Sequence, residues 1–345
     1  MNRFLPQPGG TRPAVTRPRL RAAALALAAL TAAAVAAGCT APAARPPAPA
    51  AGGTAASAAA PRASASPTAS TAVAPCDPKA SSLAPLPGPP QVTPGSFMAT
   101  IKARGHLIAG VDANTYNFEY FNPRNGQFEG FDIDMIQAVA HAIFGSDIAG
   151  RIQYKAITDA DREPDIENGS VDIVAHTMTI SCERLEHVDF SSVYFDAHGQ
   201  VLVLDSSTVT GVSDLRGQKV CATAGSDSLG NIEAYHPTVV PKIVPKIVPS
   251  ITDCLVLLQQ GQVAAITTDN SILEGLEAQD PYTKIVGPYL TDEPYGLAIA
   301  KTHPDFVRFV NAVLQQERTD GAWRASYLKW VGSPVPQPPA AAYAS

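Results

Sequence analysis

Between about residues 97 and 332, short apolar runs of strand length alternate with segments whose apolar residues recur at helical spacing. The spacing predicts strands at residues 106–111, 152–157, 173–175, 218–224, 262–269 and 294–300. It predicts helices at residues 97–104, 252–260 and 303–318, shorter helices ending near residues 169 and 235, and one from Asp132, its expected N-cap, to Gly145. Strands that alternate with helices indicate an α/β fold with mostly parallel sheets.

Both ends of the chain lack this pattern. Residues 1–39 combine a basic start with a short, alanine-rich apolar run and are typical of a secretory signal. Residues 40–96 are rich in Ala, Pro, Ser, Thr and Gly. Such a segment cannot bury enough apolar surface to offset its ordering entropy, so we expect a disordered tether. Residues 333–345 form a second low-complexity segment, which we expect to be a flexible tail.

Cys39 directly follows Ala36, Ala37 and Gly38 and resembles the modified cysteine of a bacterial lipobox. A lipid on Cys39 would anchor the mature chain to the extracytoplasmic face of the cell membrane. Ala36 stands where leucine is usual, and the alternative is an ordinary signal with an incidental cysteine.

The cysteines and the net charge narrow the functional classes. The formal net charge of −6 and the lack of basic clusters argue against nucleic acid as a partner. An exported chain meets an oxidising compartment, so we expect two disulfides among Cys76, Cys182, Cys221 and Cys254. Three connectivities exist. We favour Cys221 with Cys254, which flank one strand–helix unit, leaving Cys76 with Cys182; free buried thiols are the alternative. No spacing supports a metal site, and we expect no cofactor.

The stretch Val171–Arg184 provides the main candidate for a binding site. A buried strand ends at the hydroxyl-bearing Thr177 and Thr179, and Arg184 follows five residues later. Ligands of open α/β sheets bind at the carboxyl ends of strands, and a guanidinium fits a carboxylate bidentately. We therefore predict a pocket for the α-carboxylate and α-ammonium of a free amino acid. The alternative is a surface loop with a solvated arginine.

The second half of the chain repeats this arrangement. A helix and a glycine precede the strand that ends at Asp269, whose carboxylate suits an α-ammonium; the alternative is an N-cap for the next helix. The turn at residues 225–230 offers backbone N–H groups to an anion, although Asp227 adds like charge, and a plain helix start is the alternative. The duplication Val-Pro-Lys-Ile-Val at residues 239–249 contains three prolines, so we expect an edge strand or an extended loop.

Four motifs together resemble the family 3 bacterial extracellular solute-binding proteins, the polar amino-acid receptors of ABC importers. In order along the chain, they are Gly130–Asp134, Gly169–Asp172, Thr177–Ile180 with Glu183 and Arg184, and Asp189–Ser191. The resemblance covers residues 98–332 and implies a type II periplasmic-binding-protein-like fold. In that fold two lobes with central mixed, mostly parallel sheets are joined by two hinge strands. Lobe 1 would comprise residues 97–203 and 294–332, and lobe 2 residues 204–293.

The same resemblance implies roles for particular residues. The implied ligand contacts are Asp112, Tyr116, Thr177, Thr179, Arg184, Ser226, Asp227, Ser228 and Asp269. Arg184 and Thr179 would hold the α-carboxylate. The Thr177 carbonyl and Asp269, helped by Asp112, would hold the α-ammonium. The residues at 226–228 would cap the ligand from lobe 2, and Tyr116 would replace the usual stacking aromatic.

The pocket for the ligand's own side chain is less defined. Asp159 and Asp161 stand in a segment that is usually less acidic in the family. A glutamate or aspartate ligand would need a cation, for which Arg162, Lys155 and His176 are the candidates. A glutamine or asparagine ligand would prefer mixed donors and acceptors.

We expect a binding protein, with lobe closure on the amino acid and delivery to the permease subunits of an ABC importer. One alternative is a sensor that reports amino-acid levels to a membrane partner. Another is a dehydratase-like enzyme on this fold, using Glu119, Asp159 or His176. No nucleophile elbow, metal spacing or phosphate loop supports an enzyme.

Overall fold

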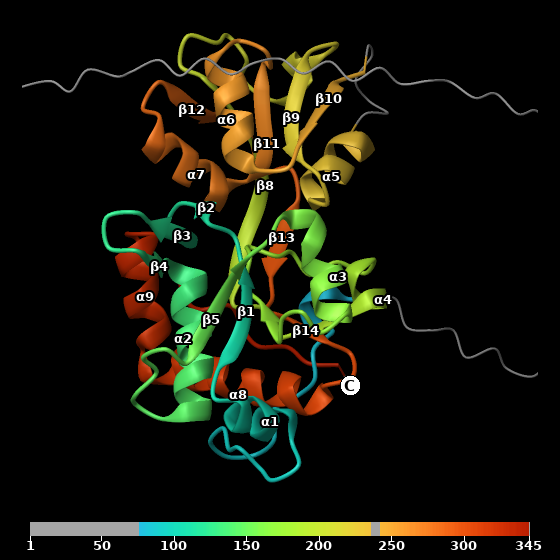
Figure 1. The fold of residues 1–345 in the computed structure, drawn as a ribbon. Helices are drawn as coiled ribbons and strands as arrows, with labels where there is room; N and C mark the ends of the chain where they lie inside the picture. The colour runs from blue at the N-terminus through green and yellow to red at the C-terminus, as the bar shows by residue number, and fades with distance from the viewer. Residues whose placement is uncertain (1–75, 236–241, 345) are drawn as a thin grey trace, which may run out of the picture. The chain divides into compact units, whose positions relative to one another are not determined.

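The computed structural model describes residues 76–235 and 242–344 (Figure 1). The expected signal, Cys39 and the tether as far as residue 75 lie outside these residues, as does the start of the duplication. In the part that is described, no helix is long and apolar enough to cross a bilayer.

A five-stranded sheet forms the centre of the first lobe, with strand order β5-β1-β6-β14-β7. β1 pairs in parallel with β5 and β6, whereas β14 is antiparallel to β6 and β7. Ile173 and Val174 are neighbours in β6 and point to opposite faces of the sheet. Ile173 packs with apolar residues of α2 and α8, and Val174 packs with an apolar residue of α3. Helices therefore cover both faces of this sheet. The strands are β1 (Leu107–Val111), β5 (Ile152–Ala156), β6 (Ile173–Val174), β7 (Val188–Phe190) and β14 (Ala298–Ala300). The helices are α1 (Phe97–Arg104), α2 (Phe131–Phe144), α3 (Arg162–Glu167), α4 (Arg184–His187), α8 (Pro304–Asp320) and α9 (Ala322–Trp330).

A second sheet with strand order β10-β9-β11-β8-β12 forms the centre of the second lobe. β10, β9 and β11 are parallel, and β8 runs antiparallel to β11 and β12. Its strands are β8 (Phe195–Leu204), β9 (Lys219–Thr223), β10 (Val244–Val248), β11 (Ala265–Asp269) and β12 (Thr283–Val286). Its helices are η3 (Val212–Leu215), α5 (Asp227–Tyr235), α6 (Ile251–Gln259) and α7 (Asn270–Gln279). The proline-containing duplication forms the edge strand β10, as the sequence indicated.

β8 and β13 (Asp292–Tyr295) form the two connecting strands (Figure 1). Residues 195–198 of β8 pair with β13, and residues 199–204 pair with the second sheet. The passage between lobes therefore falls within β8 near Gly199, earlier than the expected boundary after residue 203. The strand expected at 294–300 is divided into β13 and β14 because the chain changes sheets between them.

The start of α2 differs from the sequence prediction. The N-cap is Gly130, so Asp132 lies within the first turn. A Cβ at Gly130 would lie 2.0 Å from the carbonyl oxygen of Phe118, and only glycine fits there. Asp132 is fully buried and accepts hydrogen bonds from the Thr177 backbone N–H (2.8 Å) and the Tyr194 hydroxyl (2.8 Å). The small sheet of β2 (Asn114–Thr115), β3 (Glu119–Asn122) and β4 (Gln127–Glu129), which precedes α2, was not predicted.

The tether and the tail were both predicted too long. Residues 76–96, which include η1 (Pro78–Ala80), pack on the first lobe through Leu83 and Val92. Ser82 is buried, and its hydroxyl donates to the carbonyl of Phe190 (2.7 Å). Its backbone carbonyl accepts from the backbone N–H of Ala344 (2.8 Å), so the tail also lies against this segment. Composition alone did not predict this order, because it took no account of Leu83 and Val92, which pack on the lobe, or of the disulfide from Cys76.

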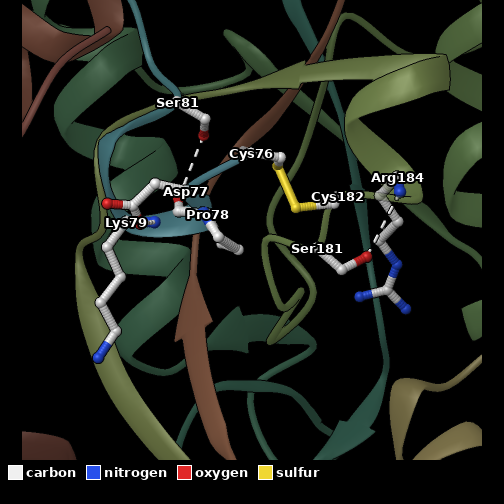
Figure 2. The surroundings of a disulfide bond; sticks show 8 residues. All are labelled: Cys76, Asp77, Pro78, Lys79, Ser81, Ser181, Cys182 and Arg184. Carbon is white, nitrogen blue, oxygen red and sulfur yellow. Dashed lines mark hydrogen bonds between the residues drawn. A yellow bond between two sulfur atoms is a disulfide. The ribbon is translucent and has the colours of Figure 1, made fainter. Parts of the chain in front are cut away.

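Two disulfides join the cysteine pairs that the sequence favoured. Cys221–Cys254 ties β9 to α6 inside the second lobe, and Cys76–Cys182 ties the N-terminal segment to the loop before α4. Figure 2 shows the second bond beside Ser181 and Arg184, whose backbone N–H is bonded to the Ser181 hydroxyl.

Removing the buried disulfide, with Cys221→Ala and Cys254→Ala together, should lower the free energy of unfolding. The bond closes a loop with a sequence separation of 33, for which chain entropy predicts a loss of about 3–4 kcal/mol. Denaturant unfolding followed by circular dichroism measures this change. Cys76→Ala with Cys182→Ala, which opens a loop with a sequence separation of 106, should lose about 1 kcal/mol more by the same argument. An unchanged midpoint in the Cys221–Cys254 variant would contradict the prediction.

Candidate functional site

A small cavity between the two lobes brings together most of the predicted site residues. Its volume is about 20 Å³, which is space for roughly one water molecule on this measure. Residues after β6 and from α4 line one side, and residues from β9–α5 and the end of β11 line the other. The lining residues are Asp159, Arg162, Thr177, Thr179, Arg184, Ser226, Asp227, Ser228, Thr268, Asp269 and Ile272.

Arg184 is buried at this cavity and is hydrogen-bonded to both lobes. Its Nη1 lies 2.8 Å from the carbonyl oxygen of Thr179 and 2.6 Å from Oδ2 of Asp227. Its Nη2 donates to the Gly225 carbonyl (3.1 Å), and its Nε lies 3.3 Å from Oε1 of Glu163. Burial and the nearby charge of Arg162 lower the pKa of Arg184, while Asp227 and Glu163 oppose this effect.

The Asp227 carboxylate therefore occupies the position on Arg184 that a ligand carboxylate needs. Burial raises the pKa of Asp227 above its ordinary value, although the charges of Arg184 and Arg162 work against this rise. The sequence indicated that Asp227 would add negative charge at this turn, and its carboxylate lies against Arg184.

Asp269 ends β11 on the second lobe's side of the same cavity. It is the N-cap residue of α7, but its carboxylate makes no cap hydrogen bond. Instead Oδ2 accepts from the Tyr295 hydroxyl at 2.6 Å, and that hydroxyl also lies 2.7 Å from Oγ of Ser271. Burial, with the nearby Glu293, raises the pKa of Asp269 well above its ordinary value. A cation beside this carboxylate would favour its ionised form.

Thr177 and Thr179 line the cavity from the first lobe. Thr177 has a left-handed backbone conformation, with φ of 41°, and its N–H is held by Asp132. The Thr179 hydroxyl donates to Oε2 of Glu293 on β13 at 2.9 Å. The loop that follows β6 is thus linked to the connecting strand β13.

The turn between β9 and α5 contacts the first lobe through a carbonyl. The Gly225 oxygen accepts from Arg184 and also from Nη2 of Arg162 (3.0 Å). The sequence argument had assigned backbone N–H groups of this turn to an anion. The Ser226 hydroxyl donates to the Thr223 carbonyl (2.8 Å), and the Ser228 hydroxyl lies 3.4 Å from that of Thr268.

The lobes approach so closely that two positions accept only glycine. A Cβ at Gly225, whose φ is 79°, would lie 2.7 Å from the Cα of Ala160. A Cβ at Gly275 in α7 would lie 2.8 Å from the carbonyl oxygen of Tyr116. Asp159 adds a hydrogen bond across the same gap, accepted from the Thr223 hydroxyl.

A larger cavity of about 260 Å³ adjoins the first and shares Asp159, Thr177, Thr268 and Ile272 with it. Asp112, Asp161 and His176 also line it. Asp112 is therefore placed beside this second cavity and holds its own turn by accepting from Ala113 N–H (2.7 Å).

Three other predicted residues have different surroundings. Tyr116 is 40% exposed, packs edge-on against Tyr120 and lines neither cavity. Lys155 pairs with Asp165 at 2.9 Å and also lines neither. Arg162 lies beside Arg184 rather than in the larger cavity, and its Nη1 is 3.1 Å from Oδ1 of Asp159. Of the three candidate cations for a distal carboxylate, only His176 lines the larger cavity.

Several contributors were missed from the sequence. Glu163, Glu293 and Tyr295 touch Arg184, Thr179 and Asp269. Glu163 lies in α3, for which the sequence gives only a weak helical pattern. Glu293 and Tyr295 lie in β13, near the expected hinge. No local sequence pattern therefore indicates that these three residues belong to the site. Thr268 directly precedes Asp269 near the end of β11, and this position at a strand end could have indicated that it lines the site. The possible catalytic Glu119 lines neither cavity.

Several known proteins resemble this chain over most of its folded region. The family model of the bacterial extracellular solute-binding proteins, family 3, matches residues 107–333. The ABC transporter glutamine-binding protein GlnH of Bacillus subtilis (strain 168) is 36% identical over 235 residues, covering 68% of this chain and 84% of that protein. The glutamate-binding protein GluB of Corynebacterium glutamicum is 29% identical over 240 residues, covering 66% and 79%. The solved structure of an ancestral arginine-binding protein bound to glutamine has a TM-score of 0.60 and 30% identity, covering 67% of this chain and 99% of that one.

Gly275→Ala should separate the effects of helix stability and lobe approach. Alanine is favoured over glycine in a helix by about 1 kcal/mol, so α7 itself should not be weakened. The new methyl group would meet the Tyr116 carbonyl and hold the lobes apart. Small-angle X-ray scattering should therefore give a larger radius of gyration than that of the parent protein.

Gly230→Ala is the matched control, because Gly230 lies in α5 of the same lobe and a Cβ there meets nothing within 4 Å. It should leave the radius of gyration unchanged. Equal scattering from Gly275→Ala and the parent protein would show that this contact does not limit lobe approach.

Proposed function

The chain belongs to the bacterial extracellular solute-binding proteins of family 3, and from this premise we propose that its two lobes capture a free polar amino acid. Arg184 binds the α-carboxylate and Asp269 the α-ammonium. Thr177 and Thr179 add contacts from the first lobe, and Ser226 and Ser228 add contacts from the second. The captured amino acid is then delivered to the permease subunits of an ABC importer.

One observation carries the proposal. A buried guanidinium from the first lobe and a buried carboxylate from the second lobe line the same cavity. A zwitterion needs opposite charges at its two poles, and charge-assisted hydrogen bonds are each stronger than neutral ones. Since each lobe holds one pole, an amino acid binds best when the lobes are together. Ligand binding therefore favours the closed arrangement by differential affinity.

The cavity must enlarge for this to happen, because its 20 Å³ holds no amino acid. Two changes supply the space: rotation of the Asp227 side chain away from Arg184, and separation of the lobes about β8 and β13. The ammonium group then meets Asp269, and its positive charge opposes the burial that raises the pKa of this carboxyl group.

The partner and the location follow from the family. GlnH of Bacillus subtilis is named as part of an ABC transporter, and a solute-binding protein of this type must stay near its permease. Lipidation of Cys39, followed by the segment to residue 75, would hold the lobes at the extracytoplasmic face of the membrane. Binding and release, without chemical change of the ligand, are the function we propose.

Arg184→Lys should weaken amino-acid binding by about a hundredfold or more, because an ammonium cannot grip a carboxylate bidentately in this position. Asp269→Asn should cause a loss of similar size by removing the charge opposite the α-ammonium. Isothermal titration calorimetry against the twenty amino acids measures both effects, with circular dichroism to check folding. Retained affinity in both folded variants would show that the ligand binds elsewhere.

Asp227→Asn should strengthen binding by about tenfold, which corresponds to about 1.4 kcal/mol. The variant removes the anion that lies 2.6 Å from Arg184 and competes with the ligand carboxylate. Asp214→Asn, at an exposed aspartate in η3 that lines neither cavity, is the control and should not change affinity. A weaker Asp227→Asn variant would mean that Asp227 contacts the ligand itself.

A further inference from the structure

The larger cavity has the position of a pocket for the ligand's own side chain. It adjoins the cavity of Arg184 and Asp269 and shares four lining residues with it. Both lobes contribute: residues 112–115 and 156–161 from the first, and residues 249–251 with Thr223 from the second. If the α-groups are held as proposed above, the side chain extends from Thr177 and Thr268 into this cavity.

The charges that line this cavity are negative. Asp112, Asp159 and Asp161 face it, and no lysine or arginine is among its lining residues in the described part of the chain. Burial acts to raise the pKa of Asp159, but the charges of Arg162 and His176 outweigh it, so the pKa lies below its ordinary value. Hydrogen bonds from Thr158 lower the pKa of Asp161. Both carboxylates are therefore ionised at neutral pH.

The nearest guanidinium is committed to other groups. Arg162 donates to the carbonyl oxygens of Asp159 (3.0 Å), His176 (3.1 Å) and Gly225 (3.0 Å), and its Nη1 also pairs with Asp159. These contacts use all three of its nitrogens. A carboxylate at the end of a ligand side chain would thus lie near other carboxylates, with no lysine or arginine in the described cavity lining to pair with it.

His176 adds a buried imidazole at the same place. Its side chain is 5% exposed, and Nε2 lies 3.2 Å from the carbonyl oxygen of Ile157, which can only accept. Nε2 therefore carries a hydrogen. Nδ1 has no hydrogen-bond partner among the described residues and lies 3.5 Å from Oδ1 of Asp159 and 3.7 Å from Oε1 of Glu119. A donor on the ligand would add a partner for the Asp159 carboxylate.

We propose that this cavity selects an amino acid whose side chain ends in N–H donors, either an amide or a cation, and rejects glutamate and aspartate. The inference rests on the proposed function, since it assumes that Arg184 and Asp269 hold the α-groups. It goes further by naming the class of side chain. The carboxylates of the lining pair with N–H groups, whereas a further carboxylate on the ligand would be repelled by them.

Glutamine and glutamate make the sharpest comparison, because they have the same length and differ only in the terminal amide or carboxylate. Calorimetric titration of the mature chain should show glutamine binding at least about tenfold more tightly than glutamate, and asparagine more tightly than aspartate. Arginine and lysine, titrated in parallel, distinguish a cation pocket from an amide pocket. Tight binding of any of these donors together with weak binding of glutamate supports the proposal.

Asp159→Asn tests the cavity directly. The variant removes a negative charge and leaves Arg162 without its carboxylate partner, so the ratio of glutamine to glutamate affinity should fall by about tenfold or more. Asp214→Asn is the control. Asp214 also has a lowered pKa, caused by hydrogen bonds from Thr210, but it lines neither cavity, so the ratio should not change.

The outcomes separate this proposal from the proposed function. Glutamate binding that equals or exceeds glutamine binding, and that is lost in Arg184→Lys, would overturn the side-chain assignment and leave amino-acid capture intact. An unchanged affinity ratio in folded Asp159→Asn would also overturn the assignment. If the folded protein binds none of the twenty amino acids, both proposals fail.

Discussion

The burial of the Arg184 guanidinium is the constraint on which the arrangement of the two lobes depends. An ionised side chain that is 4% exposed is costly unless every donor finds a partner. The first lobe supplies only the Thr179 carbonyl and Glu163, and the second lobe supplies Asp227 and the Gly225 carbonyl. Two of these four contacts therefore form only when the lobes meet. A ligand carboxylate can take over one of these positions and keep the same requirement.

Arg162 extends this constraint to a second cation. Both guanidiniums donate to the Gly225 carbonyl, so one turn of the second lobe receives two positive charges from the first. This explains why the turn needs glycine: its backbone must come within contact of Ala160, at a positive φ. The sequence suggested that the same glycine turn binds an anion through its N–H groups. Close approach to Ala160 accounts for the glycine at this position.

The fold was largely predictable because it is encoded locally. The alternation of apolar runs and helical spacing placed most strands and helices, and the strand ends identified Arg184 and Asp269. Contacts between distant segments were not predictable in this way. Asp132 has the pattern of an N-cap but serves as a buried acceptor for Thr177, 45 residues away. Asp227 meets Arg184 only across the lobe gap, and no spacing in the sequence records that distance.

If Arg184 and Asp269 hold the α-groups of an amino acid, the two cavities divide recognition into a general part and a selective part. The charges in the smaller cavity would then meet groups that every α-amino acid has, so they would not distinguish one side chain from another. Selection must arise where the lining differs, and there Asp159 has two effects. It adds a negative charge to the larger cavity, and it pairs with Arg162, which lines the smaller cavity. An arginine nearby in the sequence is therefore no indication of an acidic ligand, because its charge is already neutralised within the protein. A ligand interacts with the charges that remain after the protein's own ion pairs have formed.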